Sequence, residues 1–247
     1  KIIAEDLRFM RAHNYLGFYS ECTMDFAANF LNYYLTARLT WNPEASREQI
    51  IDDLCRRAYG PAATQMQEFY ALMEESFNSC TTVGIHPGNI PDWYSEETLQ
   101  KAGQLLAEAF NRAGSEAEKN RVRYNQTGFD YTGKVVTLFR LYQRLCDSGL
   151  PLGIAGYTPD YSKKYTRTEI VELLSQARIL GREIEAMLAQ YAGTGTIQAY
   201  PFQRQNLVKR WFASIEDYWQ LYAENSDRIA VTPLPEEWKF KTDPSDA

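Results

Sequence analysis

The sequence predicts a mainly α-helical protein, a bundle-like array of seven or eight helices preceded by one helix–strand unit of the kind that builds (β/α) barrels. Three observations favour this fold. Apolar residues recur with a helical period over most of the chain. Capping boxes open three helical segments, at Ser46–Gln49, Ser115–Glu118 and Thr166–Glu169. Gly60-Pro61 ends one helix and begins another, because Gly adopts the left-handed cap and Pro fits a first helical turn.

Length, composition and charge exclude several classes of protein. The chain has 247 residues, of which 45% are hydrophobic and 23% charged, so it is predicted to fold. Its net charge of -6 argues against nucleic acid as a partner, because a phosphate backbone attracts basic surfaces. No apolar run approaches the roughly 18 to 20 residues of a membrane span. The four cysteines and two histidines lie far apart and no Gly-rich phosphate loop is present, so neither a metal site nor a cofactor is expected.

Residues 1 to 24 are predicted to form one helix–strand unit. Residues 2 to 13 have a helical period, and the apolar run Tyr15–Tyr19 has the length of a buried strand. The polar cluster Ser20–Thr23 follows it, at the end of the strand where (β/α) barrels carry their active sites. One unit is not a barrel, and the chain begins at Lys1 inside an amphipathic pattern. We therefore expect it to be part of a longer protein whose barrel precedes it.

Residues 25 to 228 are predicted to form a helical domain. Its helical segments are separated by caps and breakers and lie at about residues 25–42, 46–58, 61–77, 95–113, 115–146, 166–192 and 203–224. Thr127-Gly128 and Thr132-Gly133 are expected to kink or interrupt the longest segment, because each glycine costs about 1 kcal/mol relative to alanine in a helix. Residues 229 to 247 are predicted to be an extended linker.

Two long segments between the helices lack a helical period. Residues 81 to 94 contain two glycines and two prolines, and loops of this length in compact domains are often functional. His86, Trp93 and Tyr94 lie in this segment, so they are candidates to bind a ligand by stacking and hydrogen bonding. The alternative is that the aromatic side chains only anchor the loop. Residues 151 to 165, with three tyrosines, leave the same two alternatives open.

The stretch from Asn29 to Pro43 resembles a known family. It carries the pattern Leu-x-x-Tyr-x-x-Ala-Arg-Leu-x-Trp-Asn-Pro over Leu31–Pro43, and the motif Tyr-Gly-Pro-Ala follows at Tyr59–Ala62. These motifs are similar to those of the bacterial domain-of-unknown-function 4838 family, whose members look like glycoside hydrolases and are related in architecture to the α-glucuronidases. In that family a (β/α) barrel precedes a helical region, and Pro233–Pro244 resembles the junction with a following β-sandwich.

The motif residues are expected to be structural, whereas Glu21 is the candidate catalytic residue. Trp41 and Pro43 are predicted to end a helix and to bury a large aromatic surface, and Arg38 to pair with a carboxylate or with exposed carbonyl groups. Glu21 follows the predicted strand, where barrels place substrate-facing groups; the alternative is a solvated loop acid. Glycoside hydrolysis needs two carboxylates, and Asp25 lies at the spacing of a helical neighbour. We therefore expect the second carboxylate in the preceding barrel.

The resemblance implies the helical C-terminal region of a carbohydrate-active, glycoside hydrolase-like protein, shaping one wall of the barrel cleft. Its partner is then an oligosaccharide or polysaccharide-derived substrate, which His86, Trp93 and Tyr94 are expected to bind by stacking and hydrogen bonding. We expect the whole protein to be periplasmic or extracellular. The chain alone is expected to be inactive, because it supplies at most one wall of the site. The alternative is a non-catalytic helical interaction or oligomerisation module. A homodimer through the helical domain is compatible with both.

Overall fold

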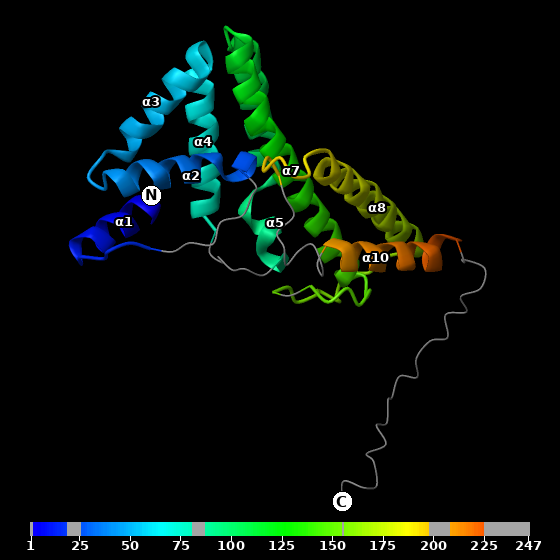
Figure 1. The fold of residues 1–247 in the computed structure, drawn as a ribbon. Coiled ribbons are helices and arrows are strands. Elements are labelled where there is room, and N and C mark those ends of the chain that lie inside the picture. Colours follow the sequence, from blue (N-terminus) through cyan, green and yellow to red (C-terminus); the bar gives the residue numbers. More distant parts are fainter. Residues whose placement is uncertain (1, 19–25, 81–86, 155, 198–207, 225–247) are drawn as a thin grey trace, which may run out of the picture.

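The computed structural model describes residues 2–18, 26–80, 87–154, 156–197 and 208–224, and these form helices joined by turns and loops (Figure 1). Within them lie eight α-helices of eleven residues or more, one short helix and no strand. The helices are α1 (Ile2–Ala12), α2 (Phe26–Trp41), α3 (Arg47–Tyr59), α4 (Ala63–Asn78), α5 (Ile90–Trp93), α6 (Glu96–Arg112), α7 (Glu116–Asp147), α8 (Arg167–Gln190) and α10 (Val208–Trp219). Turns of 3-10 helix occupy Gly60–Ala62 and Pro87–Asn89, and a π-helical turn, Gln220–Glu224, follows α10. The mainly helical prediction is confirmed.

Helix α7 is the axis of the fold. It runs through the middle of the molecule in Figure 1 and contacts α2, α3, α5, α6 and α8. Helix α4 packs against both α3 and α6, α10 lies against α8, and α1 lies against α2. The carboxylate of Glu216 on α10 accepts hydrogen bonds from Arg178 Nε at 2.7 Å and Arg182 Nη2 at 3.1 Å, which ties α10 to α8.

Three clusters of buried side chains hold the helices together. One lies among α3, α4, α6 and the first half of α7 and includes Tyr59 and Met66. Another joins the second half of α7 to α8 and α10 around Leu145 and Leu174. The third is smaller and joins α1, α2 and α3 around Leu39. Because α7 contributes to the first two clusters, the two halves of the molecule share one continuous helix.

All three predicted helix caps are present, but only two of them are complete capping boxes. Ser115 and Thr166 form complete capping boxes with Glu118 and Glu169, in which each side chain bonds the other residue's backbone N–H. Ser46 accepts a hydrogen bond from the backbone N–H of Gln49, the N-cap half of such a box. Local hydrogen bonding therefore fixes where α3, α7 and α8 begin.

The predicted interruption of the longest helix at Gly128 and Gly133 is wrong. Helix α7 is continuous over 32 residues. Gly128 lies where α2 crosses α7, and a Cβ atom on it would come within 2.3 Å of the carbonyl of Ala27. The glycine therefore permits two helix backbones to approach closely, and tertiary packing outweighs its low helix propensity.

The predicted strand at residues 15 to 19 is also wrong over its described part. Residues 15 to 18 have no strand hydrogen bonding, and the Leu16 side chain is fully exposed, at 107% of its reference area. Asn14 ends α1 with a left-handed backbone, φ 58°, and the Tyr15 N–H donates to the carbonyl of Met10. A strand needs a neighbouring strand for its backbone groups, and the described residues provide none.

The expected burial of Trp41 is a further error. Trp41 is the last residue of α2 and is 92% exposed. The α2–α3 connection is held instead by Arg8 of α1, whose Nε and Nη2 donate to the carbonyls of Pro43 and Ala45 at 3.2 and 3.3 Å. Arg38 finds no carboxylate as hydrogen-bond partner among the described residues and donates to the Tyr34 hydroxyl at 2.8 Å.

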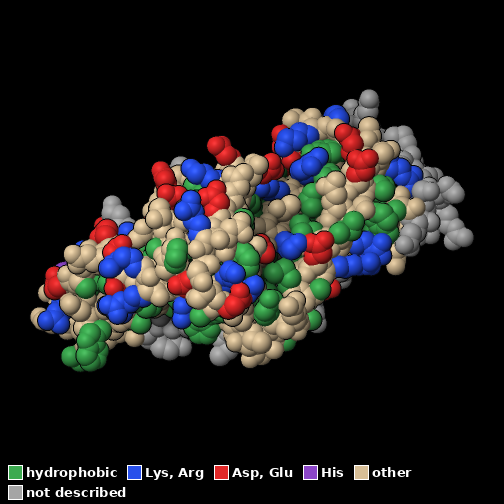
Figure 2. All heavy atoms as spheres, turned by 90° about the horizontal axis from the view of Figure 1, so that it is seen from above, with side chains coloured by type: hydrophobic (Ala, Val, Ile, Leu, Met, Phe, Trp, Pro, Cys, Tyr) green, Lys and Arg blue, Asp and Glu red, His purple; other side chains and the backbone are tan. Residues whose placement is uncertain are grey.

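The structure also shows how charge is distributed on the surface and which cysteines are free. In Figure 2 acidic and basic side chains are interspersed over the face shown, and neither sign gathers in a patch of its own. None of the helices in the described ranges is long and apolar enough to cross a membrane. Cys55, Cys80 and Cys146 are free thiols, and Cys22 lies outside the described residues.

Candidate binding cavity

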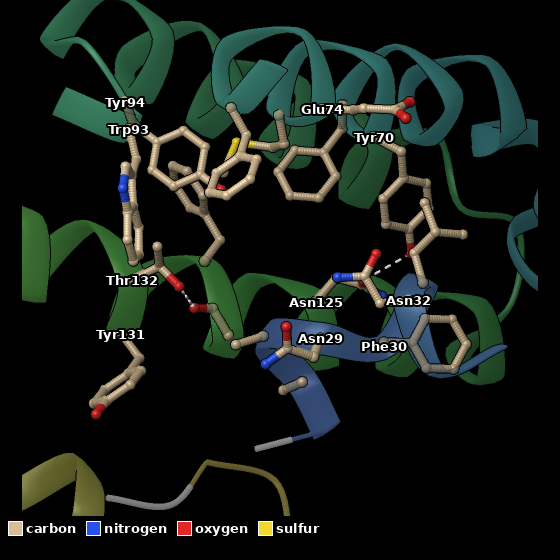
Figure 3. Close-up of a pocket in the computed structure, with 18 of the residues that line it drawn as sticks. Asn29, Phe30, Asn32, Tyr70, Glu74, Trp93, Tyr94, Asn125, Tyr131 and Thr132 are labelled. Atoms are coloured by element: carbon tan, nitrogen blue, oxygen red, sulfur yellow. Dashed lines mark hydrogen bonds between the residues drawn. The ribbon is translucent and has the colours of Figure 1, made fainter. Parts of the chain in front are cut away.

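A cavity of about 710 Å³ lies between α2, α4, α5 and α7 (Figure 3). Its volume falls in the range of roughly 300 to 1,000 Å³ that is typical of small-molecule sites. Aromatic side chains line it, contributed by Phe30, Phe69, Tyr70, Phe77, Trp93, Tyr94, Phe129 and Tyr131. Side-chain amides lie among them, from Asn29, Asn32, Asn78 and Asn125. Rings with a few polar groups between them are typical of a site for a small, partly apolar ligand.

The structure places two of the predicted sugar-binding residues, Trp93 and Tyr94, in this cavity wall. In Figure 3 the Trp93 indole is seen nearly edge-on at one end of the cavity, so that a ring face is turned toward the space between the helices. Phe77 packs against the indole edge to face, with ring centroids 5.7 Å apart. The Ser76 hydroxyl donates to the Trp93 carbonyl at 2.9 Å. Trp93 is therefore held in place from α4.

Helix α7 fixes the same segment from its other side. Arg140 Nη2 donates to the carbonyls of Pro91, at 3.3 Å, and Tyr94. Gln143 Nε2 donates to the carbonyl of Gly88 at 2.9 Å. No sequence pattern predicts the role of these two residues, because a polar side chain on a long helix has the same pattern whether it contacts solvent or a loop. Together Arg140 and Gln143 anchor residues 88 to 94, the second half of the predicted loop, as one wall of the cavity.

Trp93 and Tyr94 are half-buried and carry neutral polar groups. Burial, and then the neighbouring Cys80, raises the pKa of Tyr94 from 10 to about 12, so its hydroxyl, already neutral at pH 7, stays protonated in mildly alkaline solution as well. The indole Nε1 of Trp93 is shielded from solvent and has no hydrogen-bond partner among the described residues. Both residues therefore present neutral aromatic surface to a ligand.

The opposite end of the cavity is closed by a ring of three hydrogen bonds. The Tyr70 hydroxyl donates to Asn125 Oδ1 at 2.7 Å, Asn125 Nδ2 donates to the Tyr59 hydroxyl at 2.9 Å, and the two tyrosine hydroxyls are 2.8 Å apart. The second N–H of Asn125 donates to the carbonyl of Arg121 at 2.9 Å. With these bonds made, the amide has no donor left for a ligand. Asn125 is therefore a structural residue.

The polar groups with capacity for a ligand lie along the α2, α4 and α7 walls. Asn29 and Asn78 make no side-chain hydrogen bond to another described residue, and Figure 3 shows Asn29 between the two ends of the cavity. The Thr132 hydroxyl donates to the Gly128 carbonyl at 2.9 Å and retains its capacity to accept. Glu74 is the one acidic side chain in the described wall, and its carboxylate accepts a hydrogen bond from Arg47 of α3.

Two predicted site residues, Glu21 and His86, lie outside the described residues, as does Asp25. They belong to residues 19–25 and 81–86, which in the sequence adjoin Phe26 and Pro87. No group of three or more His, Cys, Asp or Glu in the described part of the chain is arranged to hold a metal ion.

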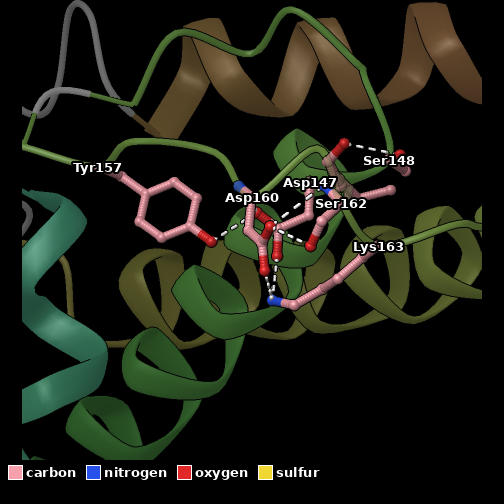
Figure 4. Close-up of polar contacts among 7 residues, drawn as sticks. Asp147, Ser148, Tyr157, Asp160, Ser162 and Lys163 are labelled. Atoms are coloured by element: carbon pink, nitrogen blue, oxygen red, sulfur yellow. Dashed lines mark hydrogen bonds and ion pairs between the residues drawn. The ribbon is translucent and has the colours of Figure 1, made fainter.

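A second polar cluster, at the end of α7, organises residues 150 to 165 (Figure 4). The Asp147 carboxylate is buried and accepts hydrogen bonds from the Tyr157 hydroxyl at 2.6 Å, the Asp160 N–H at 2.8 Å and Lys163 Nζ at 2.7 Å. Burial alone would raise the pKa of this carboxyl, but the bonds from Lys163 and Tyr157 outweigh it, so that its pKa is lowered. The cluster satisfies its own donors and acceptor, which indicates a structural anchor.

The residues that the structure describes are helical apart from turns and loops, and they enclose a ligand-sized cavity lined by aromatic and amide side chains. Residues 1–71 match the family model described as Domain of unknown function (DUF4838). The match covers α1, α2, α3 and the first half of α4, and it contains both motifs on which the resemblance depends. No curated protein and no solved structure shows significant similarity to the chain.

Proposed function

We propose that this chain is the helical region of a carbohydrate-active, glycoside hydrolase-like protein, in which it forms one wall of a substrate cleft beside a (β/α) barrel. The family match over residues 1–71 supports the placement next to such a barrel, because it contains the motif that follows the barrel in the resemblance. The cavity supports the binding role. In this proposal the chain binds and positions the sugar, and the barrel supplies the catalytic carboxylates.

The observation that carries the binding role is the Trp93 ring face at the end of a cavity with side-chain amides along its wall. A pyranose ring has one face made largely of C–H groups, which packs on an aromatic ring, and hydroxyl groups around its edge. A hydroxyl both donates and accepts a hydrogen bond, as does the carboxamide of Asn29 or Asn78. The arrangement of the wall therefore matches the two kinds of surface that a sugar presents.

The described part of the same wall lacks the pair of carboxyl groups needed for cleavage. Glycoside hydrolysis requires two carboxyl groups about 5 to 9.5 Å apart on either side of the scissile bond. Among the described lining residues only Glu74 is acidic, and Arg47 already binds its carboxylate. The predicted catalytic role of Glu21 stays a prediction. We propose that the isolated chain binds sugars without hydrolysing them.

Replacing Trp93 should weaken sugar binding. Titration of the chain with neutral gluco-, xylo- and manno-oligosaccharides is expected to give binding for at least one of them, and Trp93→Ala to weaken it by about tenfold, because the stacking surface is lost. The measurement is calorimetric titration, with the melting temperature of each variant recorded to show that it is folded.

The matched control for this experiment is Trp41→Ala. It removes the same side chain from a fully exposed position outside the cavity wall and should leave affinity unchanged. An equal loss of affinity in both variants, or no binding of any oligosaccharide by the unmodified chain, would contradict the proposal.

A second candidate function, that of a helical interaction module, is favoured by exposed apolar side chains on the first two helices and the segment between them. Ile2, Phe9, Tyr15, Leu16, Phe18, Phe26 and Trp41 are all exposed. Hydrophobic side chains project at the left-hand end of Figure 2, the end at which α1 and the α2–α3 connection lie in Figure 1. Exposed apolar side chains that form a contiguous patch mark an interaction site. We propose that it packs against the barrel in the whole protein.

The isolated chain is expected to self-associate through this surface. Sedimentation velocity over a range of concentrations should show an increase in mean mass, which the double substitution Leu16→Ser with Trp41→Ser abolishes, because less apolar area is removed from water on association. Ile179→Ser, which removes an exposed apolar side chain from α8, is the control and should change nothing. A chain that stays monomeric at all concentrations contradicts this role for the surface.

A further inference from the structure

We infer that the cavity binds a sugar that carries an apolar group, of the kind found in an aryl glycoside, in preference to an unsubstituted sugar. This inference rests on the proposed function and names the chemical class of the ligand. It depends on which helices supply the apolar side chains of the described wall and which supply the polar ones (Figure 3).

The α4 side of the cavity is an apolar stripe. Phe69, Met73 and Phe77 line the cavity at successive intervals of four residues, so they lie on one face of the helix. Phe69 is buried and packs edge to face against Phe129 of α7, with ring centroids 5.9 Å apart. Phe77 packs in the same way against Trp93, at 5.7 Å. Rings from α7 and α5 therefore extend the stripe at its two ends.

Helix α7 adds a second apolar stripe. Phe129, Val135 and Val136 line the cavity from this helix, and Val136 is buried. Phe129 and Val136 are seven residues apart, which is about two helical turns, so they lie on one face. An apolar group between the stripes of α4 and α7 is removed from water on two sides, and the gain in affinity grows with the apolar area that is buried.

The side-chain amides lie on other parts of the wall. Asn29 and Asn32 line the cavity from α2, and Asn78 follows the apolar stripe at the end of α4. Asn32 and Asn78 are exposed and Asn29 is half-buried, whereas Phe69 and Val136 are buried. The described wall is therefore amphipathic, with amides nearer the solvent and apolar side chains at greater depth.

An unsubstituted sugar matches only part of this wall. Its C–H face covers one aromatic ring, for which Trp93 is available, and its remaining surface carries hydroxyl groups. Between the stripes of α4 and α7 a hydroxyl would lose water and contact apolar side chains, which opposes binding. An aryl group attached to the sugar is suited to that space, because aromatic rings pack edge to face or offset against one another.

The test uses glycosides that share one sugar and differ in the group attached to it. Calorimetric titration measures the affinity of the chain for methyl and phenyl glycosides in the gluco, xylo and manno series, and for phenol, which lacks the sugar. In any series that binds, the phenyl glycoside should bind at least about tenfold more tightly than the methyl glycoside, because the ring buries additional apolar area. Phenol should bind at least about tenfold more weakly than that phenyl glycoside.

A substitution tests where the apolar group binds. Met73→Gln places an amide within the α4 stripe in a side chain of similar length, and should reduce the preference for the phenyl glycoside by about threefold or more. Met187→Gln makes the same change at a half-buried position of α8, outside the described wall, and should leave the preference unchanged. Melting temperatures show whether both variants are folded, and the glycoside pairs test the inference in the unmodified chain without any substitution.

The outcomes separate this inference from the proposed function. Methyl and phenyl glycosides that bind equally tightly, or a preference that Met73→Gln leaves unchanged, overturn the inference and leave the carbohydrate-binding proposal standing. Phenol that binds as tightly as the phenyl glycoside also overturns the inference, because the sugar then contributes nothing. Binding of no glycoside, together with no binding of the neutral oligosaccharides, overturns both.

Discussion

Gly128→Ala should lower the free energy of unfolding by about 3 kcal/mol or more, because an added methyl group at a helix crossing has no space to occupy. Its Cβ would lie 2.3 Å from the carbonyl carbon and oxygen of Ala27 and 2.5 Å from the backbone nitrogen of Ala28. These are backbone atoms of α2, which do not move aside as the end of a flexible side chain does. The substitution therefore forces α2 away from α7. Since both helices line the cavity, we also expect weaker ligand binding.

Gly133→Ala is the control within the same helix. A Cβ at Gly133 meets no atom within 4 Å, so the substitution should be neutral or stabilise the chain by up to about 1 kcal/mol through helix propensity. Urea unfolding followed by circular dichroism measures both variants. A similar change in the urea midpoint of Gly128→Ala and Gly133→Ala would contradict this explanation. It would show that helix propensity, and not the close approach of α2, determines the effect of a substitution at Gly128.

Asp147→Ala is expected to lower the free energy of unfolding by about 3 kcal/mol, because three donors lose their hydrogen bonds to a buried carboxylate. The Tyr157 hydroxyl and the Asp160 N–H both lose their bond, and Lys163 loses its buried partner. Residues 150 to 154 continue from this point into the core between α7 and α8, where Leu150, Leu152 and Ile154 are buried. The loss should therefore extend beyond the cluster and loosen the packing of α8. Asp217→Ala, at an exposed position on α10, is the control and should change stability little.

The same carboxylate predicts a dependence of stability on pH. Its pKa is lowered below the ordinary value of 3.8 in the folded chain, so the unfolded chain binds a proton first as the pH falls. Its contribution is thus complete at neutral pH and is lost as the pH falls from about 5 through the folded pKa. Asp147→Asn removes this titration, so the difference in stability between the unmodified chain and this variant should shrink on acidification. A difference that stays constant between pH 7 and pH 3 would contradict the role of the carboxylate.

The candidate site was predicted in part. Trp93 and Tyr94 were identified because they lie in a long segment without helical period, and this part of the chain does form a wall of the cavity. The facing wall, with Asn29 on α2 and Thr132 on α7, was not identified. Its residues lie on helices with ordinary apolar stripes, and nothing in a stripe tells which part of it faces another helix and which faces a cavity.

The sequence by itself determined the local structure. Helical period, capping side chains and the Gly60-Pro61 break predicted the helices and most of their boundaries, because these signals act between residues three or four positions apart and need no tertiary contact.

Only the tertiary structure decided which side chains meet across the chain. The same residue type has opposite roles at different positions. Gly128 permits a helix crossing and Gly133 meets nothing, whereas Trp93 is held by α4 and Trp41 is exposed to solvent. The failed strand at residues 15 to 18 has the same origin, because a strand exists only with a partner for its backbone. Such contacts depend on how helices far apart in sequence pack, and a local pattern does not contain that information.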